Sequence, residues 1–406
     1  MKILYVSQYF PPEMGAPAAR ASELAVHWSR MGHDVTLLTG FPNHPTGVVP
    51  PVWRPRLRRL VYREDVDGVH VVRTWLWPLP NRKAHERIRN YASFWLSASL
   101  TGLGLSRPDV VIGSSPQLLV ALAGWWLAWR KRVPFVFEVR DLWPESLAAV
   151  GAGGEGSLLH RVLGAIAGFL YRRSSHVVVV TPAFKDHLIR HWSVPAEKIS
   201  IVENGVETDL FRPCPPAIVP GTEGRFVICY IGTMGMAHGL ETLIAAAERL
   251  RQSFSSAMFL MIGEGAEKER IVELARTRGL NNIVFIDQQP RERIPSLIAS
   301  SDVCLVTLKK TELFKTVIPT KLLEYMACGK PVIVGVDGQA RKVVEESGGG
   351  VFVEPDDSQA LADAIVALAP DGDWRIRMGI SGRRYIVDRL SRHQTARTYV
   401  DVLENL

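Results

Sequence analysis

The sequence predicts an α/β protein of two domains, each built on a doubly wound parallel sheet. Short apolar runs bounded by Pro, Gly or Asp alternate with longer amphipathic segments along nearly the whole chain. Such alternation is typical of parallel strands that helices cover on both faces. The chain has 406 residues, of which 47% are hydrophobic and 22% charged, and at this length a single hydrophobic core usually divides into two.

The first half contains the apolar runs of one sheet. The expected strands are MKILYVSQYF, HDVTLLTG, PDVVIGSS, PFVFEVRD and HVVVVTP. The segment YREDVDGVHVVRT is expected to form a hairpin that turns at Asp67-Gly68. Helices are expected from Ala18 to Met31 and from about Lys83 to Leu105.

The second half repeats this order. Its expected strands are RFVICYIG, AMFLMIG, NIVFID, DVCLVTL, PVIVGV and GVFVEP. Residues 211–225 are rich in Pro and Gly without periodicity, which is typical of a linker. We therefore expect an N-terminal domain at 1–210, a C-terminal domain at 226–380, and a helix within 381–406 that packs back on the first domain. Ligands of such sheets bind beyond the carboxyl ends of the strands, so two facing domains would place the site in a cleft between them.

The charges of the chain are unevenly divided between its halves. Residues 1–200 contain 24 Lys/Arg and 14 Asp/Glu, a net charge of +10, whereas residues 201–406 contain 24 and 27, a net charge of −3. A basic first half favours an anionic partner there. Its basic residues lie beside many tryptophans in apolar segments, so we expect an anionic membrane surface as partner and no nucleic acid.

Two segments of the first half combine tryptophan with basic residues. In KAHERIRNYASFWLSASL, Ile88, Tyr91, Trp95 and Ala98 recur at helical spacing, near Arg82, Lys83, Arg87 and Arg89. In LLVALAGWWLAWRKR, the residues Trp125, Trp126 and Trp129 precede Arg130, Lys131 and Arg132. These segments are either core helices or interfacial helices that contact a membrane surface, and we favour the second interpretation.

The expected location is the cytoplasm, with peripheral attachment to the inner face of the plasma membrane. The four cysteines (Cys214, Cys229, Cys304 and Cys328) lack metal-ligand spacing and are expected to be free thiols in a reducing compartment. The N-terminus begins with a strand pattern rather than a secretory leader. No run reaches the roughly 18 apolar residues that a spanning helix needs.

Two glycine loops follow expected strands and precede expected helices. In YFPPEMGAPAARASEL, Gly15 stands just before a helix, an arrangement that suits an anion. In YIGTMGMAHGLETL, the residues Gly232, Gly235 and Gly239 leave several backbone N–H groups unobstructed, as a diphosphate requires. The second loop does not match the Walker or dinucleotide pattern, and an ordinary strand-to-helix turn remains the alternative for both loops.

The segment VIPTKLLEYMACGKPVIVG predicts a short helix with two charges at its start. Thr320 is expected to cap this helix. Lys321 lies in the first turn, where the helix dipole disfavours a cation unless an anion also binds there. Glu324, one turn later, can accept hydrogen bonds from two sugar hydroxyl groups. The alternative is a surface lysine in an i,i+3 pair with Glu324.

A third cluster of ionisable residues ends an apolar strand in FEVRDLWPES. It comprises Glu138, Arg140, Asp141 and Glu145, and the carboxyl end of a strand is where a doubly wound sheet binds its ligand. Asp141 as a helix cap with Arg140 as its partner is the alternative. Asp65 and Asp67 have the spacing of an Asp-x-Asp metal motif, but Asp67-Gly68 fits a hairpin turn better, so we expect no metal.

Together these segments resemble the retaining glycosyltransferases of family 4. The matching pieces, in chain order, are YFPPEMGAPAAR, GHDVTLLT, FEVRDLWPES, VENGVETDLFRP, YIGTMGMAHGLETLI, IGEGAEKERI and VIPTKLLEYMACGKPVIVG. DLWPES and IPTKLLEYMACGKP resemble the branch that contains L-fucosamine-type transferases of O-antigen and capsule assembly. The resemblance implies the GT-B fold, in which two Rossmann-like domains face an interdomain cleft.

The resemblance also implies a nucleotide sugar as donor, most readily UDP-linked, with no cofactor or bound metal. It implies a donor site that includes Gly232, Gly235, Gly263, Thr320 and Glu324 in the C-terminal domain. Three family features are absent from this sequence. The first glutamate of a pair that ends at Glu324 falls at Thr316, the loop cations fall at Thr233 and His238, and the N-terminal histidine is replaced around Arg140 and Asp141.

These departures make Lys321 the leading candidate for holding the diphosphate. Lys321, Glu324, Arg140 and Asp141 form the expected catalytic set. Lys321 and Glu324 are expected to bind the donor, Arg140 to pair with a phosphate of the acceptor, and Asp141 to orient the acceptor hydroxyl or the sugar. The expected acceptor is a saccharide or a polyprenyl-diphosphate-linked saccharide of cell-surface polysaccharide synthesis. A non-catalytic nucleotide-sugar-binding subunit and a sugar-nucleotide 2-epimerase remain the alternatives.

Overall fold

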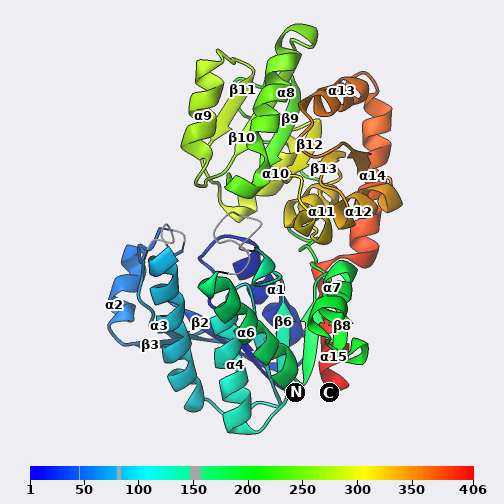
Figure 1. The fold of residues 1–406 in the computed structure, drawn as a ribbon. Helices are drawn as coiled ribbons and strands as arrows, with labels where there is room; N and C mark the ends of the chain where they lie inside the picture. Colours follow the sequence, from blue (N-terminus) through cyan, green and yellow to red (C-terminus); the bar gives the residue numbers. More distant parts are fainter. Residues whose placement is uncertain (45, 80–83, 147–156) are drawn as a thin grey trace. The chain divides into compact units, whose positions relative to one another are not determined.

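The computed structural model of the chain describes residues 1–44, 46–79, 84–146 and 157–406, and Figure 1 shows its fold. The described chain divides into two compact units. Unit 1 comprises Met1–Asn204 with Arg392–Leu406, and unit 2 comprises Gly205–Ser391. Each unit has its own β-sheet with helices packed on both faces, which confirms the predicted α/β class.

In its described residues, unit 1 contains an eight-stranded sheet in the order β3-β4-β2-β1-β5-β6-β7-β8. The strands are β1 (Lys2–Val6), β2 (Asp34–Gly40), β3 (Val61–Val66), β4 (Val69–Thr74), β5 (Val110–Ser114), β6 (Phe135–Val139), β7 (His176–Val179) and β8 (Ile199–Ile201). All neighbours are parallel except β3 and β4, which form the predicted hairpin around Asp67-Gly68. The short strand β8 was not predicted, because three residues are too few to show a periodicity.

The described helices of unit 1 pack on the two faces of this sheet. They are α1 (Ala16–Arg30), η1 (Pro51–Trp53), α2 (Arg54–Leu57), α3 (Ala84–Leu103), α4 (Leu118–Lys131), α6 (Leu158–Arg173), α7 (Pro182–Trp192), η2 (Ala196–Lys198) and α15 (Arg392–Glu404). Side chains of α1 and α15 share one hydrophobic core with the sheet. Lys83, the expected start of α3, lies outside the described residues.

Unit 2 contains a fully parallel sheet, six-stranded in the described chain, in the order β11-β10-β9-β12-β13-β14. Its strands are β9 (Phe226–Ile231), β10 (Ala257–Ile262), β11 (Ile283–Ile286), β12 (Val303–Thr307), β13 (Val332–Gly335) and β14 (Gly350–Phe352). All six were predicted, because strands buried on both faces are continuous apolar runs between Gly, Pro and Asp.

Two helical layers cover this sheet. The helices are η3 (Met236–His238), α8 (Leu240–Ser253), α9 (Lys268–Thr277), η4 (Arg291–Arg293), α10 (Ile294–Ala299), η5 (Leu313–Thr316), α11 (Thr320–Ala327), α12 (Gln339–Ser347), α13 (Ser358–Leu368) and α14 (Gly372–Arg389). One core joins α8, α9 and α13 to the sheet, and a second joins α10, α11 and α12 to its other face. Successive residues of β9 alternate between the two cores, as the pleat requires.

The boundaries of the units differ from the predicted domain boundaries. The predicted linker, residues 211–225, belongs to unit 2, because Phe211 and Val219 are buried in its core. The predicted C-terminal segment 381–406 is divided between the units: α14 ends at Arg389 in unit 2, and only α15 belongs to unit 1. A Pro/Gly-rich composition indicates irregular backbone, but it does not show whether that backbone is buried.

In unit 1, α15 packs against α1 through aromatic side chains. The ring centres of Trp28 and Tyr399 lie 5.1 Å apart in an edge-to-face arrangement. The indole Nε1 of Trp28 donates a hydrogen bond to the carbonyl of Ala396 at 3.1 Å. The last helix of the chain is therefore part of the core of the N-terminal unit.

We expect Phe211→Ala to lower the free energy of unfolding of unit 2 by about 3–5 kcal/mol, because it removes a fully buried ring from the core. Urea denaturation monitored by circular dichroism measures this loss. Ile218→Ala is the matched control in the same segment, since Ile218 is 91% exposed and its truncation should change stability by less than about 0.5 kcal/mol. Equal effects of the two substitutions would contradict the placement of Phe211.

Candidate active site

Two backbone loops of unit 2 lie against each other at the carboxyl ends of β9 and β10. Gly232 follows β9 with φ +143°, and its N–H donates to Ile262 at 2.9 Å. A Cβ on Gly263 would stand 2.0 Å from the carbonyl oxygen of Gly232, so only glycine fits at position 263. The predicted residue Gly263 thus supports the loop of Gly232 by close packing of the two backbones.

The side chain of Lys321 ends beside the Gly232 loop. Its Nζ lies 3.7 Å from the centre of the Tyr230 ring and 2.8 Å from the position that a Cβ on Gly232 would take. The Nζ atom is buried and has no hydrogen-bond partner among the described residues. The alternative of a surface lysine is therefore wrong. The ammonium lies over an aromatic face, next to the backbone of a glycine loop.

Burial controls the protonation of the groups around Lys321. Burial lowers the pKa of Lys321 to about 7, although the charge of Glu324 and the nearby Cys229 thiol oppose the shift. Burial and the charge of Lys321 lower the pKa of His238 to about 3, so His238 is neutral near pH 7. Its Nδ1 lies 3.3 Å from the carbonyl oxygen of Gly235. Lys321 is therefore the cation of this loop, and it is poised between its two protonation states.

The first turn of α11 differs from the expectation at one residue. Pro319 occupies the N-cap position without a side-chain cap, and Thr320 is the first helical residue. The predicted capping role of Thr320 is therefore wrong, because the carbonyl of Pro319 accepts the first helical bond, from the N–H of Leu322 at 3.0 Å. The helix still begins at Thr320, and the side chain of its second residue, Lys321, lies beside the glycine loop.

Glu324 forms an ion pair that the sequence analysis did not foresee. Its Oε1 accepts a hydrogen bond from Nη1 of Arg291 at 3.1 Å, and its side chain is 15% exposed. Arg291 follows β11 and lies far from α11 in the sequence, so no short-range pattern connects the two residues. The alternative pairing of Glu324 with Lys321 on an exposed helix face does not describe this arrangement.

Two further predicted positions make local contacts. The carbonyl oxygen of Thr233 accepts from the hydroxyl of Tyr230 at 2.7 Å, which fixes the start of the glycine loop. The hydroxyl of Thr316 donates to the carbonyl of Leu313 at 2.6 Å. Position 316 thus has a short, locally bonded hydroxyl, where the resemblance to family 4 implies a carboxylate.

In unit 1, the loop after β1 contains a buried carboxyl group that the sequence analysis overlooked. Oε1 of Glu13 accepts backbone hydrogen bonds from Asn43 at 2.9 Å and His44 at 2.8 Å, and Oε2 is buried with no partner among the described residues. Burial raises the pKa of Glu13 to about 7, against the lowering effect of those hydrogen bonds. Gly15 is the N-cap of α1, with φ +129°. The loop therefore combines the predicted glycine with an acidic group.

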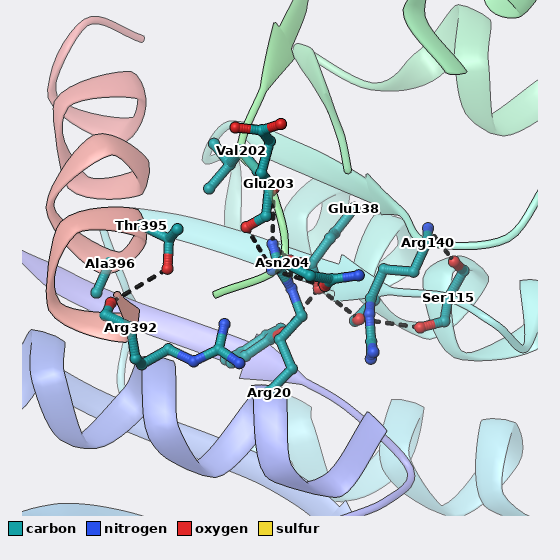
Figure 2. A network of polar contacts seen from close by, with 12 residues as sticks. Arg20, Ser115, Glu138, Arg140, Val202, Glu203, Asn204, Arg392, Thr395 and Ala396 are labelled. Atoms are coloured by element: carbon teal, nitrogen blue, oxygen red, sulfur yellow. Dashed lines mark hydrogen bonds and ion pairs between the residues drawn. The ribbon is translucent and has the colours of Figure 1, made fainter. Parts of the chain in front are cut away.

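Figure 2 shows the buried charge network around Glu138 at the end of β6. Oε1 of Glu138 accepts from Nε of Arg20 at 3.0 Å, and Oε2 accepts from the hydroxyls of Tyr5 at 2.7 Å and Ser114 at 2.5 Å. Burial opposes ionisation, but the charges of Arg20 and Arg140 hold the pKa of Glu138 below its usual value. Glu138 is thus a structural anion with its partners satisfied.

Arg20 extends this network to Asn204, the last residue of the first segment of unit 1. Its guanidinium donates to the carbonyls of Val202 and Glu203 and to the side chain of Asn204, all visible in Figure 2. One turn later on α1, Glu23 accepts from Arg392, the first residue of α15, at 2.8 Å. Helix α1 therefore holds both chain segments that lead out of unit 1.

The other members of the FEVRDLWPES cluster separate into two kinds. Oε1 of Glu145 accepts from His187 at 2.9 Å and from Trp192 at 3.2 Å, so Glu145 anchors α7. Arg140 bonds through its backbone N–H to Ser115 at 2.7 Å, and its side-chain Nε has no partner among the described residues. Burial raises the pKa of Asp141 to about 6, against the charge of Arg140. Arg140 and Asp141 therefore remain as the candidate reactive pair of this strand end.

Asp65 and Asp67 belong to the hairpin of β3 and β4. Asp65 bonds to Nδ1 of His70 at 2.5 Å, and Asp67 occupies the turn with φ +50°. The four cysteines are free thiols. Within the described ranges, no cluster of three His, Cys, Asp or Glu side chains could hold a metal ion.

The tryptophan-rich helices of unit 1 are partly core and partly surface. Ala98 is buried, whereas Ile88, Trp95 and Leu100 on α3 and Trp129 on α4 are exposed. Arg82 and Lys83 lie outside the described residues. No helix in the described part of the chain combines the length and apolar character that a membrane span requires.

Comparison with protein families matches each unit to one domain type. Residues 15–205 match the glycosyl transferase 4-like domain, and residues 217–385 match the glycosyl transferases group 1 domain. The first match lies in unit 1 except for its last residue, Gly205, and the second lies in unit 2, which supports the division of the chain that the structure shows.

Curated relatives cover most of the chain at low identity. A putative colanic acid biosynthesis glycosyl transferase, WcaI of Escherichia coli, is 25% identical over 384 residues, which are 90% of this chain and 91% of that protein. A probable glycosyltransferase, WbjE of Pseudomonas aeruginosa, is 26% identical over 68% of this chain and 69% of its own length.

Solved structures share the GT-B fold with this chain. A sucrose-phosphate synthase of Thermosynechococcus elongatus has a TM-score of 0.79 at 19% identity, with 100% of this chain and 98% of that chain covered. HepE of Anabaena, solved in complex with UDP-glucose, has a TM-score of 0.72 at 19% identity, with both chains fully covered.

We expect Glu13→Gln to remove a pH-dependent loss of stability. The folded protein binds the Glu13 proton more tightly than the unfolded chain, so its contribution to stability falls as pH rises from about 4.5 to about 7. Glutamine keeps the acceptor for Asn43 and His44 without the buried charge. At pH 8 the variant should therefore exceed the wild type by on the order of 2 kcal/mol, and at pH 5 it should not. Chemical denaturation at both pH values measures the difference.

Glu197→Gln is the control for this experiment, because Glu197 is exposed in the same unit. It should leave the stability difference between pH 5 and pH 8 as in the wild type. A Glu13→Gln variant that loses the same stability at both pH values would show that the ionised form is the one the fold prefers.

Proposed function

We propose that the chain, which has the GT-B fold, is a glycosyltransferase, because residues 15–205 match a glycosyl transferase 4-like domain and residues 217–385 match a glycosyl transferases group 1 domain. We propose that it transfers a hexosyl or N-acetylhexosaminyl group from a UDP-sugar, with retention of configuration and without a metal ion or cofactor. The proposed acceptor is a saccharide, most readily one linked to polyprenyl diphosphate, in cell-surface polysaccharide synthesis. The colanic acid assignment of WcaI supports this class of product.

The observation that supports this proposal most directly is the buried ammonium of Lys321. A buried cation without a hydrogen-bond partner is costly, and a bound anion would relieve that cost. The diphosphate of the donor fits, because Gly232 has no side chain beside the ammonium and the start of α11 adds its dipole. The Anabaena relative in structure, HepE, has been solved with UDP-glucose.

In the proposed reaction, negative charge develops on the diphosphate next to Lys321. Cleavage of the bond between the sugar and UDP leaves negative charge on the diphosphate and an oxocarbenium-like sugar. Lys321 and the dipole at the start of α11 stabilise the leaving group, in place of the loop cations that Thr233 and neutral His238 do not supply. The acceptor hydroxyl attacks from the face that UDP leaves, and its proton passes to a donor phosphate oxygen. Glu324 accepts hydrogen bonds from the donor ribose.

Arg140 and Asp141 are the proposed acceptor residues of unit 1. Asp141, with a pKa of about 6, is largely ionised at neutral pH and orients the acceptor hydroxyl. The side chain of Arg140, whose Nε lacks a partner among the described residues, pairs with a phosphate of the lipid-linked acceptor. A lipid-linked acceptor also requires the enzyme to reach a membrane surface.

The exposed apolar side chains of α3 and α4 are the proposed membrane contact. Leu96, Leu100 and Trp129 are each more than half exposed. Arg130 and Lys131 end α4 next to Trp129 and would meet anionic headgroups. The protein would then act in the cytoplasm, attached peripherally to the inner face of the plasma membrane.

We expect Lys321→Ala to weaken donor binding by roughly 10- to 100-fold, the range for a lost hydrogen bond to a charged group. A panel of UDP- and GDP-sugars, scored for transfer to a lipid-linked saccharide, first identifies the donor. Binding of that donor is then measured by calorimetry. Lys342→Ala is the control, since Lys342 is an exposed lysine of the same unit.

This panel also separates the proposed function from its alternatives. A protein that binds UDP-sugars but never turns them over would be a binding subunit, as the missing carboxylate at Thr316 would permit. Epimerisation of the donor without any acceptor would indicate the epimerase. Unchanged donor affinity in Lys321→Ala would remove Lys321 from the site.

We expect the affinity for the UDP-sugar to fall as pH rises above 7. In the protein without a ligand, Lys321 loses its proton near this pH, because its pKa is about 7. A bound diphosphate requires the ammonium, so at higher pH binding is coupled to the uptake of a proton. The affinity should decrease by up to tenfold per pH unit. Calorimetry between pH 6 and pH 9 measures this slope, and Lys321→Arg should bind without it, because arginine does not titrate in this range.

We expect the protein to float with anionic vesicles at low salt and to dissociate as salt rises. Leu100→Glu should reduce the bound fraction at least roughly fivefold by placing a charge on the apolar surface. Ile376→Glu is the control, because Ile376 is similarly exposed on α14 of unit 2. Absence of flotation at low salt, together with full activity on soluble acceptors, would refute the membrane contact.

A further inference from the structure

Three segments that lie far apart in the sequence of unit 2 meet at one side chain, Arg291. Arg291 is the first residue of η4, which follows β11, and Glu324 lies in α11. Phe211 lies near the N-terminal end of unit 2, which begins at Gly205. The guanidinium carbon of Arg291 lies 4.9 Å from the centre of the Phe211 ring. Its Nη1 donates to Oε1 of Glu324 at 3.1 Å. Arg291 therefore lies between an aromatic platform and the carboxylate.

This arrangement fixes the carboxylate of Glu324 in place. Phe211 is fully buried, so its ring is a rigid support for the guanidinium. The side chains of Arg291 and Glu324 are 31% and 15% exposed, which shields their ion pair from water more than a surface pair is shielded. A planar guanidinium on a fixed ring allows few orientations of the bonded carboxylate.

The same contact keeps the two charges of α11 apart. Lys321 and Glu324 are three residues apart on one helix, a spacing at which opposite charges attract. In the structure Glu324 instead bonds to Arg291, and Nζ of Lys321 has no hydrogen-bond partner among the described residues. Arg291 thus holds the carboxylate while the ammonium remains available to an anion.

We propose that Arg291 is a positioning residue for the donor nucleotide: it orients the carboxylate of Glu324 toward the ribose hydroxyl groups. The inference rests on the proposed function, which assigns the ribose to Glu324. A carboxylate offers about four acceptor positions, so a bond from Arg291 is compatible with bonds from ribose hydroxyls. Arg291 acts through Glu324 and touches no reacting atom.

The test compares UDP with 2′,3′-dideoxy-UDP, which lacks both ribose hydroxyl groups. Calorimetry gives the dissociation constants for the wild type, Arg291→Met, Glu324→Gln and the double variant. We expect Arg291→Met to weaken UDP binding about tenfold and dideoxy-UDP binding less than twofold. In the Glu324→Gln background, the same substitution should change UDP binding less than twofold, because the group that Arg291 orients is then altered.

Arg293→Met is the matched control on the same helical turn. Arg293 donates to Gln289 at 3.0 Å and should affect neither nucleotide. Arg291→Lys is the second variant, for use if Arg291→Met unfolds: it keeps the charge but not the planar fork, and should retain part of the discrimination between the two nucleotides.

Three outcomes would overturn the inference. Equal weakening of UDP and dideoxy-UDP would show a general effect on the fold, and a full effect in the Glu324→Gln background would show that Arg291 acts independently. Unchanged UDP binding in Arg291→Met would exclude any role. A wild-type protein that binds neither nucleotide would instead contradict the proposed function, which is a separate result.

Discussion

The burial of the Lys321 ammonium beside the Gly232 loop is the constraint on which the rest of unit 2 depends. The ammonium fits there only because position 232 has no side chain, and the loop keeps its place only because Gly263 allows the two backbones to touch. The bond between Glu324 and Arg291 occupies the carboxylate that is nearest to Lys321 along the helix. These contacts together leave a cation that lacks a hydrogen-bond partner in the described structure, which makes this position the candidate site for an anion.

The buried charged groups of unit 1 differ from Lys321 and from one another in whether hydrogen-bond partners satisfy them. Glu138 is fully buried, but Arg20, Tyr5 and Ser114 satisfy its two oxygens, so it contributes to the fold. Asp141 and Glu13 have raised pKa values because burial outweighs their partners. Perturbed ionisable groups at the carboxyl edge of a doubly wound sheet mark candidate functional positions, whereas balanced ones mark the framework. This distinction separates Asp141 from Glu138, although both stand in one short sequence motif.

The candidate site residues depend on contacts from distant parts of the chain. Arg291 reaches Glu324 from after β11, and Phe211 supports Arg291 from the start of unit 2. In unit 1, α1 binds the last residues before the unit boundary through Arg20 and the first residue of α15 through Glu23. Helix α1 thus connects the Gly15 loop, the charge network of Figure 2 and both exits of the chain from unit 1.

The sequence by itself determined the α/β class, nearly all strands and the β3–β4 hairpin, because buried parallel strands and an Asp-Gly turn are local patterns. It also singled out Lys321, Glu324, Arg140 and Asp141, because a charge inside an apolar motif is visible without a structure. Only the tertiary structure decided that Phe211 belongs to a core, that Thr320 does not cap α11, and that Glu138 and Glu145 are framework residues. Arg291, Arg20 and Glu13 were missed for the same physical reason. Their contacts are with residues that are distant in sequence, and their burial cannot be predicted from the local spacing of residues.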